Sequence, residues 1–192
     1  MVFSSLLFLF VFLPLALGSY FLIPARRLPL RNLHLLLFSL LFYAWGEPRL
    51  IWCMLVCILA NWLGARAIAA TALPWQRRLA LAATLTVSLG MLVVFKYAAF
   101  ALSNWNAMAA LWGGSPLATN HVASLIMPIG ISFYTFQAVS YTLDVYWKKV
   151  EPTPSLTDFA AYVTMFPQLV AGPIVRYETV MDELRSRTVD VD

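Results

Sequence analysis

The stretch that decides the fold is Phe3 to Ile23, FSSLLFLFVFLPLALGSYFLI, which runs for 21 residues without a charged side chain. As an α-helix it would be about 31 Å long, which matches the hydrocarbon thickness of a lipid bilayer. Pro14 lies inside the stretch and can kink such a helix. We therefore expect a first membrane-spanning helix here.

The charges around this stretch distinguish a retained span from a cleaved signal peptide. Ala16-Leu17-Gly18 resembles a cleavage site, but no Lys or Arg precedes the apolar run, whereas Arg26, Arg27 and Arg31 follow it. A signal peptide has the opposite order of charges. The segment is therefore interpreted as a retained span with its N-terminus outside.

The composition of the whole chain indicates a membrane protein. Of the 192 residues, 61% are hydrophobic and 11% are charged, whereas soluble domains carry about 25% charged residues. The net charge of +4 does not indicate a nucleic-acid partner, because the basic residues lie between apolar segments and not on one patch. Membrane lipid is the expected surrounding.

Further apolar runs predict further spans. The second run is short for a span, so we expect it to be extended or tilted, and the stretch before the last run is rich in Asn and Gly. These runs cover residues 32–45, 50–70, 79–102 and 122–147, with an external loop predicted over 103–121. The predicted fold is all-α: one polytopic transmembrane domain over 1–192, with about five transmembrane helices plus a re-entrant or sixth segment.

Basic residues predict the orientation of these spans. With the N-terminus outside, eight Lys and Arg residues fall on one side and two, Arg49 and Lys96, on the other. Because cytoplasmic loops carry the excess of basic residues, the eight should be cytoplasmic. They are Arg26, Arg27, Arg31, Arg66, Arg77, Arg78, Lys148 and Lys149.

The C-terminal part, 155–192, is predicted to hold a re-entrant segment and a polar helix. Residues 159–174 are apolar but contain Pro167, Gly172 and Pro173, and a full crossing would place the later arginines outside. A re-entrant hairpin keeps them cytoplasmic, and irregular backbone is tolerated at membrane depth where protein surrounds it. Residues 178–187 should then form a short polar surface helix.

Polar residues of the last span are the candidates for a functional cleft, because intramembrane polar groups are costly. Tyr134, Gln137 and Tyr141 share one helical stripe with Gly130, and Ser132 and Asp144 lie on the same span. The stripe suits either a ligand cleft or hydrogen bonding between packed helices. Asp144 is either functional or paired with Lys148 one turn later.

Few other residues suggest chemistry. Arg176 follows the Gly172-Pro173 break and is a candidate for binding an anionic coenzyme phosphate, with a surface role as the alternative. His34 and His121 have no sequence-local partner that would make either a general base. Cys53 and Cys57 share one helix face and suit packing. We therefore assign no catalytic residue and no metal ligand in this chain.

Several stretches together resemble the membrane-bound O-acyltransferase family. The nearest resemblance is to its bacterial branch, which includes the membrane subunit of alginate O-acetylation and the D-alanine transfer protein of teichoic acid synthesis. The stretches are Met1–Ser5, Leu41–Trp45, Met127–Phe136, Ser140–Tyr146 and Phe166–Ile174.

The resemblance implies a multi-span enzyme of the bacterial inner membrane with no bound cofactor. It would take an acyl group from a cytoplasmic donor, acetyl-CoA or another acyl thioester, and pass it across the membrane. The acceptor would be an exported polysaccharide such as alginate, reached through a periplasmic or extracellular acyltransferase partner.

The chain also departs from this family. Members are much longer, and their essential histidine lies in a later membrane segment that neither His34 nor His121 matches. We therefore expect an N-terminal fragment of an O-acyltransferase. The alternative is a non-enzymatic membrane protein, either a small transporter or an assembly subunit.

Overall fold

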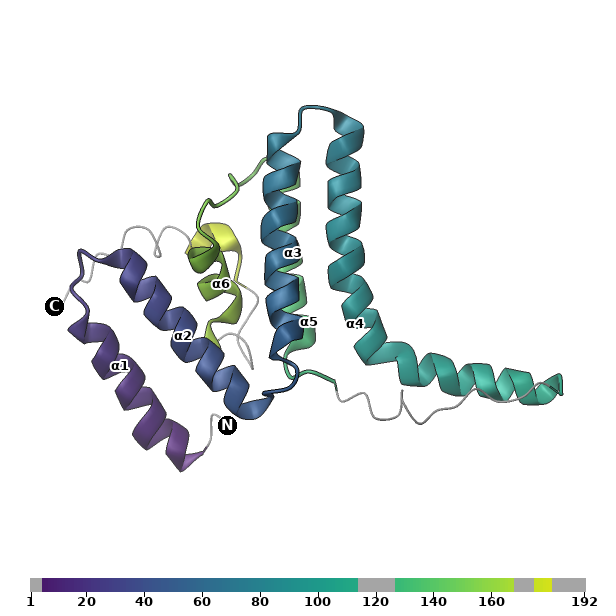
Figure 1. The fold of residues 1–192 in the computed structure, drawn as a ribbon, viewed down its shortest axis with the longest axis horizontal. Helices are drawn as coiled ribbons and strands as arrows, with labels where there is room; N and C mark the ends of the chain where they lie inside the picture. Colours follow the sequence, from purple (N-terminus) through teal and green to yellow (C-terminus); the bar gives the residue numbers. More distant parts are fainter. Residues whose placement is uncertain (1–4, 114–126, 168–174, 181–192) are drawn as a thin grey trace.

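The computed structural model describes residues 5–113, 127–167 and 175–180, and these are helical without a strand. The prediction of an all-α membrane protein is confirmed. In chain order the elements are a π-helical turn η1 (Phe8–Phe12), α1 (Leu13–Leu22), α2 (Leu28–Gly46), α3 (Ile51–Ala70), α4 (Pro74–Leu111), α5 (Ile131–Tyr146) and α6 (Leu156–Thr164), shown in Figure 1.

Three of these helices, α2, α3 and α4, are long and apolar enough to cross a membrane, and the N-terminal helix over Phe8–Leu22 is apolar but shorter. The short second apolar run is extended on both sides, as expected. Pro29 and Pro74 lie in the first turns of α2 and α4. Proline is tolerated there because the N–H groups of a first helical turn form no hydrogen bond within the helix. Many large apolar side chains on these helices are exposed, including Leu37, Leu59 and Val94, which fits a surface in contact with lipid.

The packed centre is formed by α3, which contacts α4 on one side and α5 on another. The short helix α6 packs on α2 and α3, and α1 lies beside α2 at the edge (Figure 1). Gly64 of α3 allows a close approach, because a Cβ placed there would collide with Oγ1 of Thr84 on α4. Small residues of this kind let membrane helices approach closely.

Helix α4 is longer than the sequence predicted. It has 38 residues, which as a straight helix would measure about 57 Å, nearly twice the hydrocarbon core. Its buried residues, Thr84, Ser88 and Leu92, all lie in its first half. In Figure 1 the helix bends and its later part projects away from the other helices.

This extension corrects part of the predicted loop over 103–121. Residues 103–111 continue α4, and the helix ends where Gly113 takes a φ of +71°. The three alanines of this stretch favour a helix more strongly than its two asparagines oppose one. Residues 114–121 lie outside the described part of the chain.

Helix α5 starts later than the predicted fifth span. Gly130 has a φ of +72° and precedes Ile131, the first helical residue, so Gly130 and Pro128 delimit the helix and do not interrupt it. Only glycine adopts this left-handed backbone freely. Residues 122–126 lie outside the described part.

The C-terminal segment is described only in pieces. Helix α6 has nine residues and rises about 14 Å, which is too short to cross a bilayer. Residues 177–180 are helical, at the start of the predicted polar helix. Residues 168–174 and 181–192 lie outside the described part, so the re-entrant segment stays a prediction.

Candidate functional site

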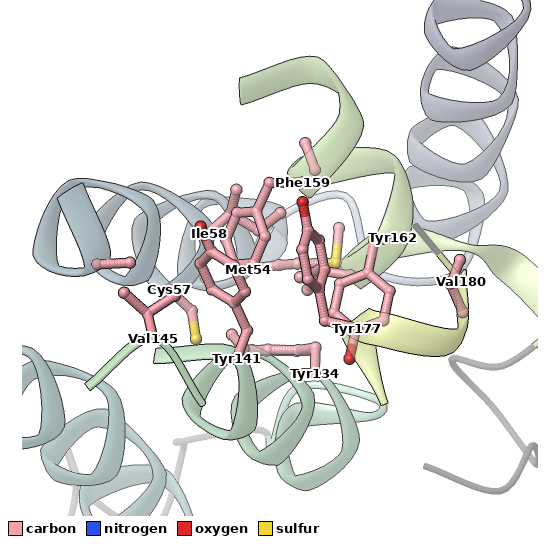
Figure 2. Close-up of a cluster of buried hydrophobic side chains, with 14 of the residues drawn as sticks. Met54, Cys57, Ile58, Tyr134, Tyr141, Val145, Phe159, Tyr162, Tyr177 and Val180 are labelled. Atoms are coloured by element: carbon pink, nitrogen blue, oxygen red, sulfur yellow. The ribbon is translucent and has the colours of Figure 1, made fainter. Parts of the chain in front are cut away.

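Helix α5 carries the predicted cleft residues, and most of them point inward. Tyr134, Gln137, Tyr141 and Asp144 are buried, and Ser132 is half-buried. Figure 2 shows the two tyrosines in a cluster with Met54 and Cys57 of α3, Phe159 and Tyr162 of α6, and Tyr177. The stripe is therefore part of the core of the described structure.

The polar groups of this stripe bond to neighbouring segments. Gln137 donates from Nε2 to the carbonyl of Tyr162 on α6, at 3.0 Å. The hydroxyl of Tyr141 accepts from the backbone N–H of Thr153, also at 3.0 Å. These bonds match the packing alternative for the stripe. Its role as a cleft lining in a larger protein stays a prediction.

Other buried hydroxyls lie next to the stripe. They belong to Tyr43 on α2 and to Tyr134 and Thr135 on α5. The hydroxyls of Tyr43 and Tyr134 interact with each other, and that of Thr135 interacts with Cys57 on α3. These groups therefore add polar contacts between α2, α3 and α5 beside the stripe.

A buried polar node that the sequence analysis did not single out joins three helices. Asn61 of α3 donates from Nδ2 to Oγ of Ser88 on α4, at 2.8 Å, and its Oδ1 accepts from Oγ1 of Thr142 on α5, at 2.7 Å. All three side chains are fully buried. The sequence does contain a signal for this node. An asparagine inside an apolar span predicts hydrogen bonds to neighbouring helices, because its amide needs partners there.

Asp144 pairs with a different lysine from the one expected. Its carboxylate lies 4.0 Å from Nζ of Lys149, whereas the sequence suggested Lys148. The reason is that α5 ends at Tyr146 and Lys148 takes a φ of +59°, so Lys148 no longer lies one helical turn from the acid. The N–H of Lys149 closes the end by donating to the carbonyl of Asp144, at 2.9 Å.

Neither Arg176 nor the histidines form a catalytic arrangement in the described residues. Arg176 is exposed just before the helical turn at 177–180, and its binding of a donor stays a prediction. His34 has its Nε2 2.8 Å from Oγ of Ser19 and stacks on Phe38 with ring centroids 4.4 Å apart, so it joins α1 to α2. His121 lies outside the described part.

The described residues contain no group of three metal-ligating side chains, and Cys53 and Cys57 are buried free thiols. Two pockets of the described part differ in character. One, of about 560 Å³, lies where the ends of α3, α4 and α5 meet and includes Arg77, Lys148 and Lys149. The other, of about 300 Å³, is apolar and lies between α2, α3 and α6.

The fold thus defines an all-helical membrane protein whose buried polar groups tie its helices together. Over all of its length the chain is similar to the probable alginate O-acetylase AlgI of Azotobacter vinelandii, with 42% identity over 38% of that protein. The probable alginate O-acetylase AlgI of Pseudomonas aeruginosa is 40% identical to the whole chain, over 36% of its own length.

A more distant relative is the peptidoglycan O-acetyltransferase of Helicobacter pylori, which is 31% identical over 97% of this chain and 39% of that protein. No family model and no solved structure gives a significant match. The resemblance to the membrane-bound O-acyltransferases is confirmed along the whole chain. The chain spans less than two fifths of the length of these relatives.

Proposed function

We propose that this chain is part of a membrane O-acetyltransferase that modifies an exported polysaccharide. The observation that carries the proposal is the similarity, at 40–42% identity over the entire chain, to proteins named as probable alginate O-acetylases. The helices described here would form a scaffold of that enzyme.

The proposed reaction moves an acetyl group from a thioester to a sugar hydroxyl. The acetyl C–S bond of the donor, acetyl-CoA or another acyl thioester, breaks and a C–O ester bond forms. The hydroxyl proton leaves with a general base, and the thiol is released on the donor side. An alginate-like polysaccharide would be the final acceptor, reached through a periplasmic or extracellular partner protein.

The proposed topology is multi-pass in the bacterial inner membrane with the N-terminus outside. The basic ends of the helices would be cytoplasmic. The later part of α4 exposes Phe100, Trp105 and Leu111, and we propose that it lies along the outer interface, where aromatic side chains are favoured. Residues 155–192 would form the re-entrant segment and the polar helix on the cytoplasmic side.

The proposed roles of single residues follow from their positions. Ser132, Tyr134, Gln137, Tyr141 and Asp144 would border the path of the acyl group in the whole enzyme, and Arg176 would contact the donor. The buried hydroxyls of Tyr43 and Tyr134 beside the stripe support this, because a hydroxyl can donate to a passing carbonyl. The general base would come from a segment other than those described here, since the contacts of His34 are with Ser19, Tyr20 and Phe38 of α1 and α2 and not with the stripe on α5.

The test is a chimera in which this chain replaces the matching segment of the Azotobacter vinelandii relative. Membranes containing the chimera are incubated with radiolabelled acetyl-CoA and polymannuronate, together with the other acetylation proteins of the host. We expect labelled ester on the polymer, and none from this chain expressed alone. A chimera that folds and inserts but leaves the polymer unlabelled would contradict the proposal. Solute uptake by liposomes containing the chain alone would instead support the non-enzymatic alternative.

A further inference from the structure

The pocket of about 560 Å³ lies at one end of the helical bundle and is lined by three cationic side chains. It is bounded by the last residues of α3, the connection to α4 and the segment after α5, at the top of Figure 1 where α3 and α4 join. Arg77, Lys148 and Lys149 line it, opposed by one acid, Glu151. A pocket of about 560 Å³ with this charge favours an anionic ligand.

The cationic side chains of this pocket have only part of their hydrogen-bonding capacity used within the described chain. Arg77 donates from Nη2 to the carbonyl of Tyr146, at 2.8 Å, while its buried Nε has no partner among the described residues. Lys149 is 4.0 Å from Asp144, at the limit of an ion pair. A phosphate group in the pocket would supply acceptors for the remaining terminal N–H groups of the Arg77 guanidinium and for the two lysines.

The backbone at the pocket is held in an unfavourable conformation. Lys148 has a φ of +59° and is the only residue other than glycine with positive φ in the described part of the chain. This conformation costs a non-glycine residue free energy, and such strain gathers at functional sites. It places two adjacent lysines at the pocket instead of continuing α5.

The surroundings place the pocket at the depth of lipid headgroups. Trp75 lies on the first turn of α4 and Trp147 follows α5, and both are exposed. Nζ of Lys149 lies 5.1 Å from the ring centroid of Trp147. Exposed tryptophans beside basic residues at helix ends are typical of the membrane–water interface.

We propose that this pocket binds the phosphate group of an anionic membrane lipid, such as phosphatidylglycerol or cardiolipin, in the cytoplasmic leaflet. Basic pockets between membrane helices on the cytoplasmic side recognise such headgroups. A soluble phosphate ester such as coenzyme A carries the same chemistry. The interfacial tryptophans favour the lipid, because they place the pocket against the bilayer. The site borders the proposed acyl path at the pair of Lys149 with Asp144. Its placement in the cytoplasmic leaflet rests on the proposed topology, but lipid binding does not depend on acetyl transfer.

The test measures lipid retention by the purified full chain in native mass spectrometry, with phosphatidylglycerol or zwitterionic phosphatidylcholine added to the detergent micelle. Lys148→Gly removes a charge and suits the positive φ, and Arg77→Gln removes a second charge. The matched control is Arg78→Gln, because Arg78 is exposed on the same turn and does not line the pocket. Helical content by circular dichroism checks that each variant is folded.

We expect phosphatidylglycerol to bind more tightly than phosphatidylcholine, and each pocket variant to weaken it about tenfold, as for the loss of one charge-assisted hydrogen bond to the phosphate. The control should stay within about twofold of the parent chain, because Arg78 does not line the pocket. Equal binding of the two lipids, or an equal loss in the control, would overturn the proposal. Displacement of phosphatidylglycerol by millimolar coenzyme A would reassign the pocket to a soluble phosphate ester and overturn the lipid assignment.

Discussion

Removing the amide of Asn61 should loosen the junction of α3, α4 and α5. Its two interhelical hydrogen bonds, to Ser88 and Thr142, are 2.8 and 2.7 Å long. Such bonds average about 0.6 kcal/mol in membrane proteins, so Asn61→Ala should lose about 1.2 kcal/mol from the two bonds. Truncation of a fully buried side chain adds a cavity term to this loss.

A double-mutant cycle separates the bond from the cavity. The free energy of unfolding is measured by titration with denaturing detergent in mixed micelles for Asn61→Ala, Thr142→Val and the double variant. The cavity left by Asn61→Ala is present both in that single variant and in the double variant, so its cost cancels in the cycle. The coupling energy therefore reports the hydrogen bond between Asn61 and Thr142 and should be about 0.6 kcal/mol. Ser103→Ala is the matched control, because that exposed hydroxyl donates only to Phe100 of its own helix. A coupling energy of zero within error would refute the reasoning.

Three further predictions concern packing, capping and topology. Gly64→Ala should destabilise the fold by about 1–3 kcal/mol in the same titration, because its Cβ would collide with Thr84; Gly90→Ala has open space and should be neutral or stabilising by up to about 1 kcal/mol. Ser155→Ala removes the side-chain cap of α6 and should cost about 1 kcal/mol, seen as faster hydrogen exchange confined to that helix. Gly113→Cys should react with an impermeant maleimide in intact spheroplasts, whereas the parent chain should not, because its two native thiols are buried; labelling only after lysis would reverse the proposed topology.

Much of the fold was predictable because it follows from local patterns. Apolar runs of a length that spans a bilayer indicated the helices, and α3 was predicted to within one residue at its start. The predicted loop over 103–121 rested on its Asn and Gly residues, whereas helix propensity continues α4 to Leu111. The start of α5 was misplaced because periodicity does not report a backbone angle such as that of Gly130.

The candidate site was less predictable. The stripe on α5 was found, because helical spacing alone places Tyr134, Gln137 and Tyr141 on one face. Its partners were not, since Tyr162 and Thr153 approach it only in the folded chain. The pairing of Asp144 with Lys149 depended on how α5 ends.

The sequence by itself determined that this protein lies in a lipid membrane, that it is helical and that it resembles O-acyltransferases. These properties follow from hydropathy, helical period and short motifs, which depend only on neighbouring residues. Only the tertiary structure decided which polar groups meet. Asn61 and Thr142 are 81 residues apart and share a bond, and the basic pocket combines the ends of three helices. The physical reason is that a buried polar group needs a partner in space, and spatial proximity depends on how the helices pack.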